Sequence, residues 1–216
     1  VYLSNGIYED KKLPAGDELH VYDGENDIYC NECGACRLIL SGEVSRKIFW
    51  AFEDGVLTIT GRGKIKNFSA GVTPWSHLAE YITNVVIGEG ITYVGSSSFY
   101  CCANIESVEL PETLTAMGNY VFYGCSALKS IEIPEAVTEI GKYSFRRSGL
   151  ETIDFGIGYG WSAGDREFSI ADIISGGWRF ISKSYYKQTW VRNTEAAVET
   201  LDPSYVAGGI MHTDVI

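Results

Sequence analysis

Apolar side chains recur along the middle of the chain with a period of about 23 residues. The repeat divides the sequence into units at 82–104, 105–127 and 128–149, with a partial unit at 150–168. Apolar and polar residues alternate in segments such as "SVEL" and "SIEI", and this period of two predicts a short β-strand that buries one face. The apolar columns are Ile82, Ile105, Leu128 and Leu150; Val85, Val108, Ile131 and Ile153; and Ile87, Leu110, Ile133 and Phe155.

The remainder of each unit predicts two corners. Pro111 and Pro134 end the strand, because proline cannot donate to a β-ladder. A second apolar pair follows, and then a glycine at a fixed place, which indicates a φ above zero or a tight corner. A short segment then reaches a phenylalanine and predicts one helical or 3₁₀ turn. The columns are Ile91 and Val94, Leu114 and Met117, and Val137 and Ile140; Gly95, Gly118 and Gly141; and Phe99, Phe122 and Phe145.

One unit alone cannot bury its apolar side chains, so the pattern predicts that the units stack. Stacking places each inward residue on its copy in the next unit, about 4.8 Å away where the strands are hydrogen-bonded. The predicted result is a short right-handed solenoid with a ladder of aliphatic side chains and a ladder of phenylalanines.

The two ends of such a stack need covering, because terminal units expose apolar surface and unpaired strand edges. Residues 48–81 predict an N-terminal β cap, since "VLTITG" alternates and "EDG" predicts a turn before it. "TPWSHLAEYI" predicts a short amphipathic piece that leads into the first unit. Residues 169–216 are expected to form an aromatic-rich C-terminal cap or extension, and residues 1–47 a separate N-terminal segment.

Three segments of the chain repeat one text: "ITNVVIGEGITYVGSSSFYCC", "IESVELPETLTAMGNYVFYGC" and "LKSIEIPEAVTEIGKYSF". Together with the upstream "FWAFEDGVLTITGRGKIKNF" and "TPW", they resemble the BspA-like leucine-rich repeat proteins of bacterial cell surfaces. The resemblance covers roughly residues 48–155. It implies an α/β leucine-rich-repeat solenoid, β-dominated, that is a short right-handed array with N- and C-terminal caps. It also implies a secreted or surface-attached protein with roles in adhesion and host-protein binding, and it brings no catalytic motif.

Charge and composition narrow the classes of partner. The chain carries 17 Lys and Arg against 28 Asp and Glu, and its net charge of −11 argues against nucleic acid and anionic membranes as partners. No run of about 18 apolar residues occurs, so we expect no membrane insertion. Because the chain opens on "VYLSNGIYEDKK", without an initiator Met, we expect a mature or trimmed fragment without its signal peptide.

Two rows of carboxylates are predicted on the outer surface of the stack. At about 5 Å per step, they would offer a face to a basic protein or to a hard cation such as Ca²⁺. The alternative is a solvated edge whose charge keeps the protein soluble. The row on the strands is Glu109, Glu132 and Asp154, and the row after the strands is Glu89, Glu112 and Glu135.

A cluster of cysteines in "YCNECGACRL" is a candidate metal or redox site. Thiolates two residues apart can share a tetrahedral Zn²⁺, and a redox role for such a pair is a second reading. A disulfide within the cluster, or free thiols in an ordered loop, are the remaining alternatives. The candidate ligands are Cys30, Cys33 and Cys36, with His20 as the nearest fourth.

Cys102 and Cys125 form a separate pair, at the same place in successive repeats. A small, weakly polar residue packed in the core explains that column, in which Ser148 follows. A disulfide between stacked units is the alternative.

The C-terminal stretch is unusually aromatic. Exposed aromatic side chains stack on sugars or anchor protein interfaces, whereas buried ones would cover the last repeat. The candidate binding residues in this stretch are Trp178, Tyr185, Tyr186 and Trp190.

These patterns favour a non-enzymatic bacterial surface or secreted binding module that presents its repeats for protein–protein contact or host-cell adhesion. His20, His77 and His212 are scattered, and the sequence offers no nucleophile–histidine–carboxylate arrangement. We expect no cofactor, an extracellular or cell-surface location, and a protein or glycoprotein partner of possible host origin. The alternatives are a zinc-binding or redox protein that uses the cysteine cluster, and a carbohydrate-binding module that uses the C-terminal aromatics.

Overall fold

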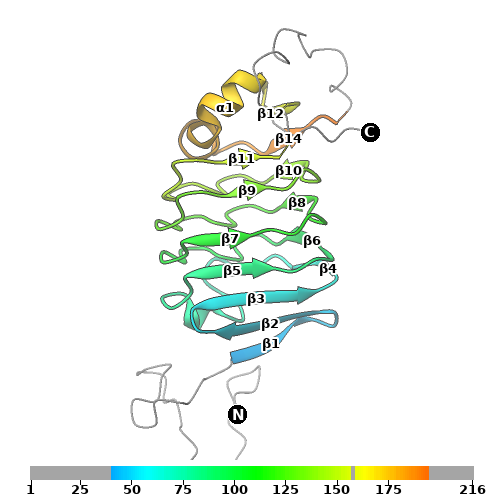
Figure 1. Cartoon of the computed structure of the whole chain (residues 1–216), viewed down its shortest axis with the longest axis vertical. Helices are drawn as coiled ribbons and strands as arrows, with labels where there is room; N and C mark the ends of the chain where they lie inside the picture. The colour runs from blue at the N-terminus through cyan, green and yellow to red at the C-terminus, as the bar shows by residue number, and fades with distance from the viewer. Residues whose placement is uncertain (1–39, 157–158, 195–216) are drawn as a thin grey trace, which may run out of the picture.

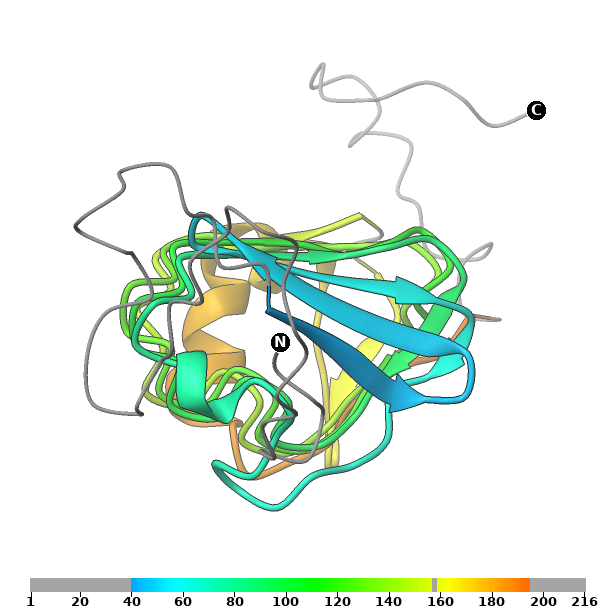
Figure 2. The same cartoon turned by 90° about the horizontal axis from the view of Figure 1, so that it is seen from below.

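Short strands stack as successive rungs along the long axis of the chain (Figure 1). The computed structural model describes residues 40–156 and 159–194. Viewed along the stack, the rungs superpose with their corners aligned (Figure 2). Two faces of the stack carry strands, and turns connect them.

The first face contains the strands that the alternation predicted. Neighbouring strands here are parallel, with Val85 opposite Val108 and Phe155 opposite Ile133. Within the β5–β7 and β9–β11 pairs, each apolar residue therefore lies beside its own copy, and the predicted strands are confirmed. They are β5 (Asn84–Ile87), β7 (Ser107–Glu109), β9 (Glu132–Ile133) and β11 (Asp154–Phe155).

A second parallel ladder runs along another face. Tyr93 lies opposite Ala116, and Met117 lies opposite Ile140, in unbroken succession. The sequence predicted an apolar pair at this place in each repeat but did not identify it as a strand. These strands are β4 (Gly63–Lys64), β6 (Ile91–Val94), β8 (Ala116–Met117) and β10 (Glu139–Ile140).

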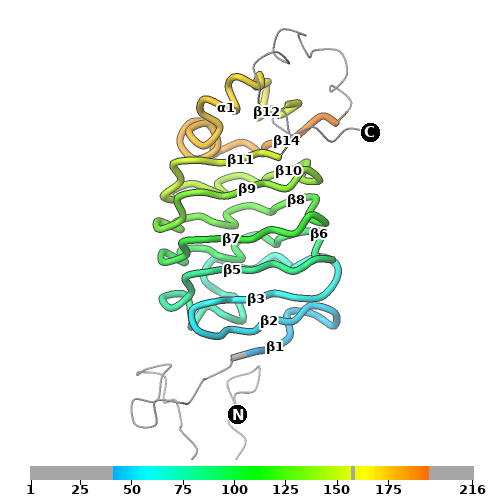
Figure 3. The backbone as a smooth tube through the Cα atoms, viewed as in Figure 1, coloured from blue at the N-terminus to red at the C-terminus, as the bar shows by residue number. Residues whose placement is uncertain are grey.

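Hydrogen-bonded turns follow β6, β8 and β10, where the sequence predicted a helical or 3₁₀ turn. The turns after β6 and β8 are tied to the next rung, as when the N–H of Phe99 donates to the carbonyl of Val121 at 3.0 Å, and the turn after β10 is tied to Tyr186 through the N–H of Tyr143. Within 82–149 the structure contains no helix. The helices of the described residues lie outside these rungs, and Figure 3 follows the backbone through the turns.

Of the two causes expected for the glycine column, the structure shows the tight corner and not the positive φ. Gly95, Gly118 and Gly141 do not adopt positive φ. Instead, a Cβ atom on Gly141 would lie 2.3 Å from the carbonyl carbon of Gly118, and one on Gly95 would lie 1.8 Å from the oxygen of Lys66. Neighbouring backbones therefore approach too closely at this corner for any side chain.

An antiparallel meander precedes the repeats. It consists of β1 (Leu40–Ser45), β2 (Ile48–Glu53) and β3 (Val56–Gly61), and β3 pairs in parallel with β5. The predicted "VLTITG" strand and "EDG" turn are confirmed, since Asp54 and Gly55 both have positive φ between β2 and β3. The short 3₁₀-helix η1 (Ser76–Leu78) follows Trp75, whose indole N–H donates to the carbonyl of Ser98 at 3.0 Å.

A strand and helix assembly covers the other end (Figure 1). β14 pairs antiparallel with β10 and with β12, so it extends the second ladder. The sequence predicted no helix at the place where α1 lies. The elements are β12 (Trp161–Ala163), β13 (Arg166–Glu167), α1 (Ile170–Arg179), the π-helical η2 (Phe180–Ser184) and β14 (Trp190–Arg192).

One continuous core runs through the stack, from Val44 to Trp190. The predicted phenylalanine ladder is present: the ring centroids of Phe99 and Phe122 are 5.2 Å apart, and those of Phe122 and Phe145 are 5.6 Å apart. Trp75 extends this ladder at 5.9 Å from Phe99. In the described part of the chain, no helix is long and apolar enough to cross a membrane.

Candidate functional site

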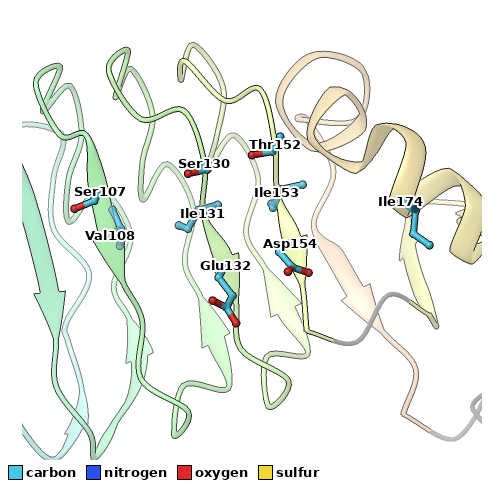
Figure 4. A pocket seen from close by; sticks show the side chains of 9 residues that line it. All are labelled: Ser107, Val108, Ser130, Ile131, Glu132, Thr152, Ile153, Asp154 and Ile174. Atoms are coloured by element: carbon cyan, nitrogen blue, oxygen red, sulfur yellow. The ribbon is translucent and has the colours of Figure 1, made fainter. Parts of the chain in front are cut away.

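A groove crosses the first face at the second, third and fourth rungs (Figure 4). Glu132 and Asp154 extend from neighbouring strands on the same side, and both are exposed. The groove has a volume of about 560 Å³, and Ile174 of α1, a residue that is 72% exposed, stands at one border. Its lining residues are Ser107, Val108, Ser130, Ile131, Glu132, Thr152, Ile153, Asp154 and Ile174.

The groove lies where the first face is interrupted. One sheet ends at β7, and β9 pairs only with β11, so no ladder joins β7 to β9 among the described residues. The second ladder is continuous at the same level, and the N–H of Ala127 still donates to Ala103 at 2.9 Å. The second ladder and this turn therefore hold the rungs together, while the edges of β7 and β9 remain unpaired with each other.

Proline ends the strands on this face but does not by itself explain the interruption. Pro134 follows β9 and has no N–H to donate, and Pro111 occupies the same place after β7. β7 nevertheless pairs with β5, so the proline column alone does not separate β7 from β9.

A smaller hollow adjoins the groove and is acidic. It has a volume of about 210 Å³. Three of its lining residues carry carboxylates, and the others give it an apolar floor, so it suits a cation on an aliphatic stem. The lining residues are Val108, Glu109, Leu110, Glu112, Glu132 and Pro134.

The two predicted carboxylate rows are exposed along their length. Glu109, Glu132 and Asp154 gather at the two hollows just described. In the other row, Glu89 accepts hydrogen bonds from the N–H groups of Glu112 and Thr113 at 3.0 and 3.4 Å. Glu89 therefore already serves as a clamp between rungs, which leaves it less available to a ligand.

Metal binding was a second possibility for the acidic rows. The described residues include no group of three or more His, Cys, Asp or Glu side chains that could hold an ion. Cys30, Cys33, Cys36 and His20 lie outside the described residues, so the prediction of a zinc or redox site there stays a prediction.

The predicted C-terminal aromatics do not form one surface. Trp190 is fully buried against Phe168, with ring centroids 4.5 Å apart, so it offers no face to a ligand and its predicted contact role is corrected. Tyr185 also packs on Phe168, at 5.3 Å. Trp178 is half-buried beneath the ammonium of Lys183, 4.8 Å from its ring centre. Tyr186 lies elsewhere, against Arg146.

Cys102 and Cys125 are buried and unbridged, as expected for core residues. Burial raises the pKa of the Cys102 thiol to about 12 and raises the pKa of Cys125 well above its ordinary value. The Cys125 thiol donates to the carbonyl of Phe99 at 3.3 Å. Neither thiol is suited to act as a nucleophile, because the reactive thiolate is disfavoured.

Sequence reasoning missed two features of the outer surface. The groove depends on the interruption between β7 and β9, for which the repeat sequence carries no distinguishing local signal, since Pro111 and Pro134 occupy the same column. A row of tyrosines on the turns was also missed, although Tyr100 aligns with Tyr123 and Tyr120 aligns with Tyr143 in the repeat. Reading the polar columns as closely as the apolar ones would have found that row.

The repeats match a known protein family. Residues 77–159 match the family model described as "BspA type Leucine rich repeat region (6 copies)". These residues form a BspA-type leucine-rich repeat region. The match confirms the expected family for these residues. Their inward columns hold mainly Ile and Val in place of Leu. The comparison with curated proteins gives no match.

Solved structures with similar repeats come from several bacteria. A leucine-rich repeat protein from Eubacterium ventriosum is 30% identical, with a TM-score of 0.46, over 56% of this chain and 41% of that one. The pneumococcal vaccine antigen PcpA is 21% identical, with a TM-score of 0.36, over 51% of this chain and 30% of that one. A leucine rich cell surface protein from Faecalibacterium prausnitzii is 17% identical, with a TM-score of 0.22, over 58% and 57% of the two chains.

Proposed function

We propose that this chain is a non-enzymatic binding module of a bacterial surface or secreted protein. It would act in protein–protein contact or host-cell adhesion by presenting the groove over β7, β9 and β11 to a protein or glycoprotein. The observation that carries the proposal is the convergence of polar and apolar residues from three successive rungs on one groove. Family membership of residues 77–159 supports a role in binding and a location at the cell surface.

The chemistry of the groove favours a basic segment as the bound part of the partner. Glu109, Glu132 and Asp154 supply negative charge, and the half-buried Val108 and Ile153 supply apolar contact. Complementary charge speeds encounter and excludes acidic partners, while apolar contact contributes affinity. Because the stacked rungs hold these side chains in a fixed arrangement, little conformational entropy is lost on binding.

We also infer that the rungs form a right-handed solenoid of about 23-residue repeats with a cap at each end. Hydrogen bonds that join residues 23 positions apart support this repeat length, as between the side chains of Asn84 and Ser107. The pairing of β3 with β5 and of β14 with β10 supports capping, because each covers a strand edge that would otherwise attract other chains. On this basis we propose the domain limits 1–47, 48–81, 82–168 and 169–216, with β1 (Leu40–Ser45) added to the first cap because it pairs with β2.

The proposal is tested with the chain immobilised and exposed to purified extracellular-matrix and cell-surface glycoproteins. We expect at least one to bind, and the triple variant E109A/E132A/D154A to weaken that binding by about tenfold or more, since desolvated charge pairs contribute strongly. The matched control is E80A/E139A/E167A, which removes three exposed carboxylates outside the groove. Equal weakening by both variants, or the absence of any bound glycoprotein, would contradict the proposal.

A further inference from the structure

A row of tyrosines lines the turns that follow β6, β8 and β10, away from the groove residues. Tyr100 and Tyr123 stack with ring centroids 5.0 Å apart and an angle of 2° between their planes. Tyr120 and Tyr143 stack in the same way, at 4.7 Å and 3°. Tyr186, from the segment before β14, continues this row at 5.5 Å from Tyr143. We call these five residues the tyrosine row.

Each residue of the tyrosine row is half-buried, so part of its surface remains accessible to solvent. Its rings already stack on one another and contribute to holding the rungs together, which explains their regular spacing. For Tyr123, Tyr143 and Tyr186, however, no hydrogen bond occupies the hydroxyl group within the described structure. A ligand therefore meets a series of free phenolic hydroxyls, separated by the C–H edges of the rings.

Three cations border the tyrosine row. The guanidinium of Arg146 lies 3.8 Å from the ring centre of Tyr186, and that of Arg147 lies 5.8 Å from the ring centre of Tyr123. The ammonium of Lys187 lies 5.9 Å from Tyr186. Neither arginine has an ion-pair partner in the described part of the chain. Stacking on a ring leaves the N–H edges of a guanidinium free to bind an anion.

The backbone beneath these side chains is strained. Tyr120, Tyr143 and Arg147 have φ angles of 59°, 62° and 59°, a region that side-chain-bearing residues rarely adopt. Gly124, one repeat before Arg147, adopts the same region at 76°. Ser97 and Cys101, at the same two places in the first repeat, have φ angles of 58° and 59°. The positive φ is therefore a regular feature of these turns, and it fixes where the side chains of each turn lie.

The sign of the charge here is opposite to that of the whole molecule. The chain carries a net charge of −11, and the groove is bordered by carboxylates. Cations are nevertheless concentrated at one end of the tyrosine row, where the "RRSG" of the third repeat replaces the "YGCSA" of the second. This segregation of charge selects a ligand that is anionic.

We propose that the tyrosine row, with Arg146, Arg147 and Lys187, is a binding site for an acidic glycan. The guanidinium groups fit carboxylate or sulfate oxygens in a two-pronged geometry. The phenolic hydroxyls and ring edges fit the hydroxyls and C–H groups that a sugar chain presents at every residue. An acidic peptide would also satisfy the arginines, but it lacks the repeated hydroxyls of a sugar chain, which can both donate to and accept from phenolic groups. This site is separate from the groove and does not rest on the function proposed for it.

The test is calorimetric titration of the whole chain with four probes. Oligogalacturonate carries carboxylates, a heparin oligosaccharide carries sulfates, a malto-oligosaccharide is neutral, and poly-glutamate is an acidic peptide. We expect at least one of the first two to bind, and the comparison between them identifies the anionic group. The neutral sugar and poly-glutamate should bind at least about tenfold more weakly, since a charged hydrogen bond contributes about that factor. Poly-glutamate binding as strongly as either glycan, or failure of both glycans to bind, would overturn the proposal.

Variants test whether the glycan binds at this site or is attracted to exposed cations in general. R146Q/R147Q should weaken glycan binding by about tenfold or more, whereas R46Q/R62Q, an equal change of charge at exposed positions of the N-terminal meander, should not. Y143F keeps the stacked ring but removes its hydroxyl, and should weaken binding by about threefold. Equal loss in both arginine pairs, or full affinity in R146Q/R147Q, would refute the site. Groove variants should bind the glycan normally, so the two proposals fail independently.

Discussion

At the scale of single residues, the distance between neighbouring rungs decides which side chains are allowed. Gly118 and Gly141 lie where two backbones meet, and a Cβ at Gly141 would also be 2.6 Å from the amide nitrogen of Asn119. Ser144, three residues later, is buried and donates to the carbonyls of Gly118 and Gly141 at 2.7 and 2.8 Å. The corner is therefore fixed both by the lack of a side chain and by a buried hydroxyl.

Gly141→Ala should destabilise the fold by about 1–3 kcal/mol, because the added methyl group forces the third rung away from the second. The free energy of unfolding, measured in urea, checks this expectation. Lys142→Ala is the matched control, since Lys142 is exposed beside Gly141 and its loss should change stability by no more than about 0.5 kcal/mol. Similar stabilities for both variants would show that the corner tolerates a side chain.

At the scale of elements, hydrogen bonds in the first turn of α1 fix where this helix begins. Ser169 accepts a hydrogen bond from the N–H of Asp172 at 3.1 Å, and the Asp172 carboxylate accepts one from the N–H of Ser169 at 3.0 Å. This reciprocal capping box satisfies donors that a helix N-terminus leaves free. The same carboxylate lies 3.4 Å from the guanidinium of Arg166, which links α1 to β13.

The pH dependence of α1 follows from this cap. Hydrogen bonds from the backbone and side chain of Ser169, with help from Arg166, hold the pKa of Asp172 below its ordinary value of 3.8. The ionised carboxylate therefore stabilises the fold above that pH, and its contribution is lost as the pH falls through the lowered pKa. Wild type should be more stable than D172A at pH 7, and urea unfolding at pH 7 and at decreasing pH should show the difference shrinking. A difference that persists unchanged in strong acid would contradict the role of the charge.

At the scale of the whole molecule, stacking joins all the rungs through one core. Trp50 and Trp75 lie in this core near its beginning, and Trp161 and Trp190 lie in it near its end. The two proposed binding surfaces lie on different parts of the stack and carry opposite charge. One rigid module could thus hold a basic protein segment and an acidic glycan at the same time.

A continuous core predicts a single unfolding transition. In urea, tryptophan fluorescence, which reports both ends, and far-ultraviolet circular dichroism, which reports the strands, should give the same midpoint. Phe122→Ala, in the middle of the phenylalanine ladder, should lower both midpoints together and cost about 3–5 kcal/mol. Two separate transitions, or midpoints that move apart in the variant, would show that the ends unfold independently of the repeats.

Much of the fold is local and is visible in the sequence. The alternation around Val108 and Ile131 predicts the strands of the first face, and the recurring phenylalanines predict their own ladder. The second ladder was missed because β8 is only two residues long, too short to show a period. For α1 a signal was present in Ser169 and Asp172, at the spacing of a capping box, but it was not used.

The candidate site likewise has one part that the sequence predicts and another that it does not. Alternation alone placed Glu109, Glu132 and Asp154 on the outside of the stack, because side chains on a strand must point to opposite faces. The sequence by itself thus determined the repeat, its inward columns and its outward charges, all of which depend on neighbours a few residues apart. Only the tertiary structure decided that β7 and β9 separate, that Trp190 is buried against Phe168, and that Arg146 lies on Tyr186. Those outcomes depend on how the rungs and the C-terminal elements pack against one another, and no local pattern encodes that packing.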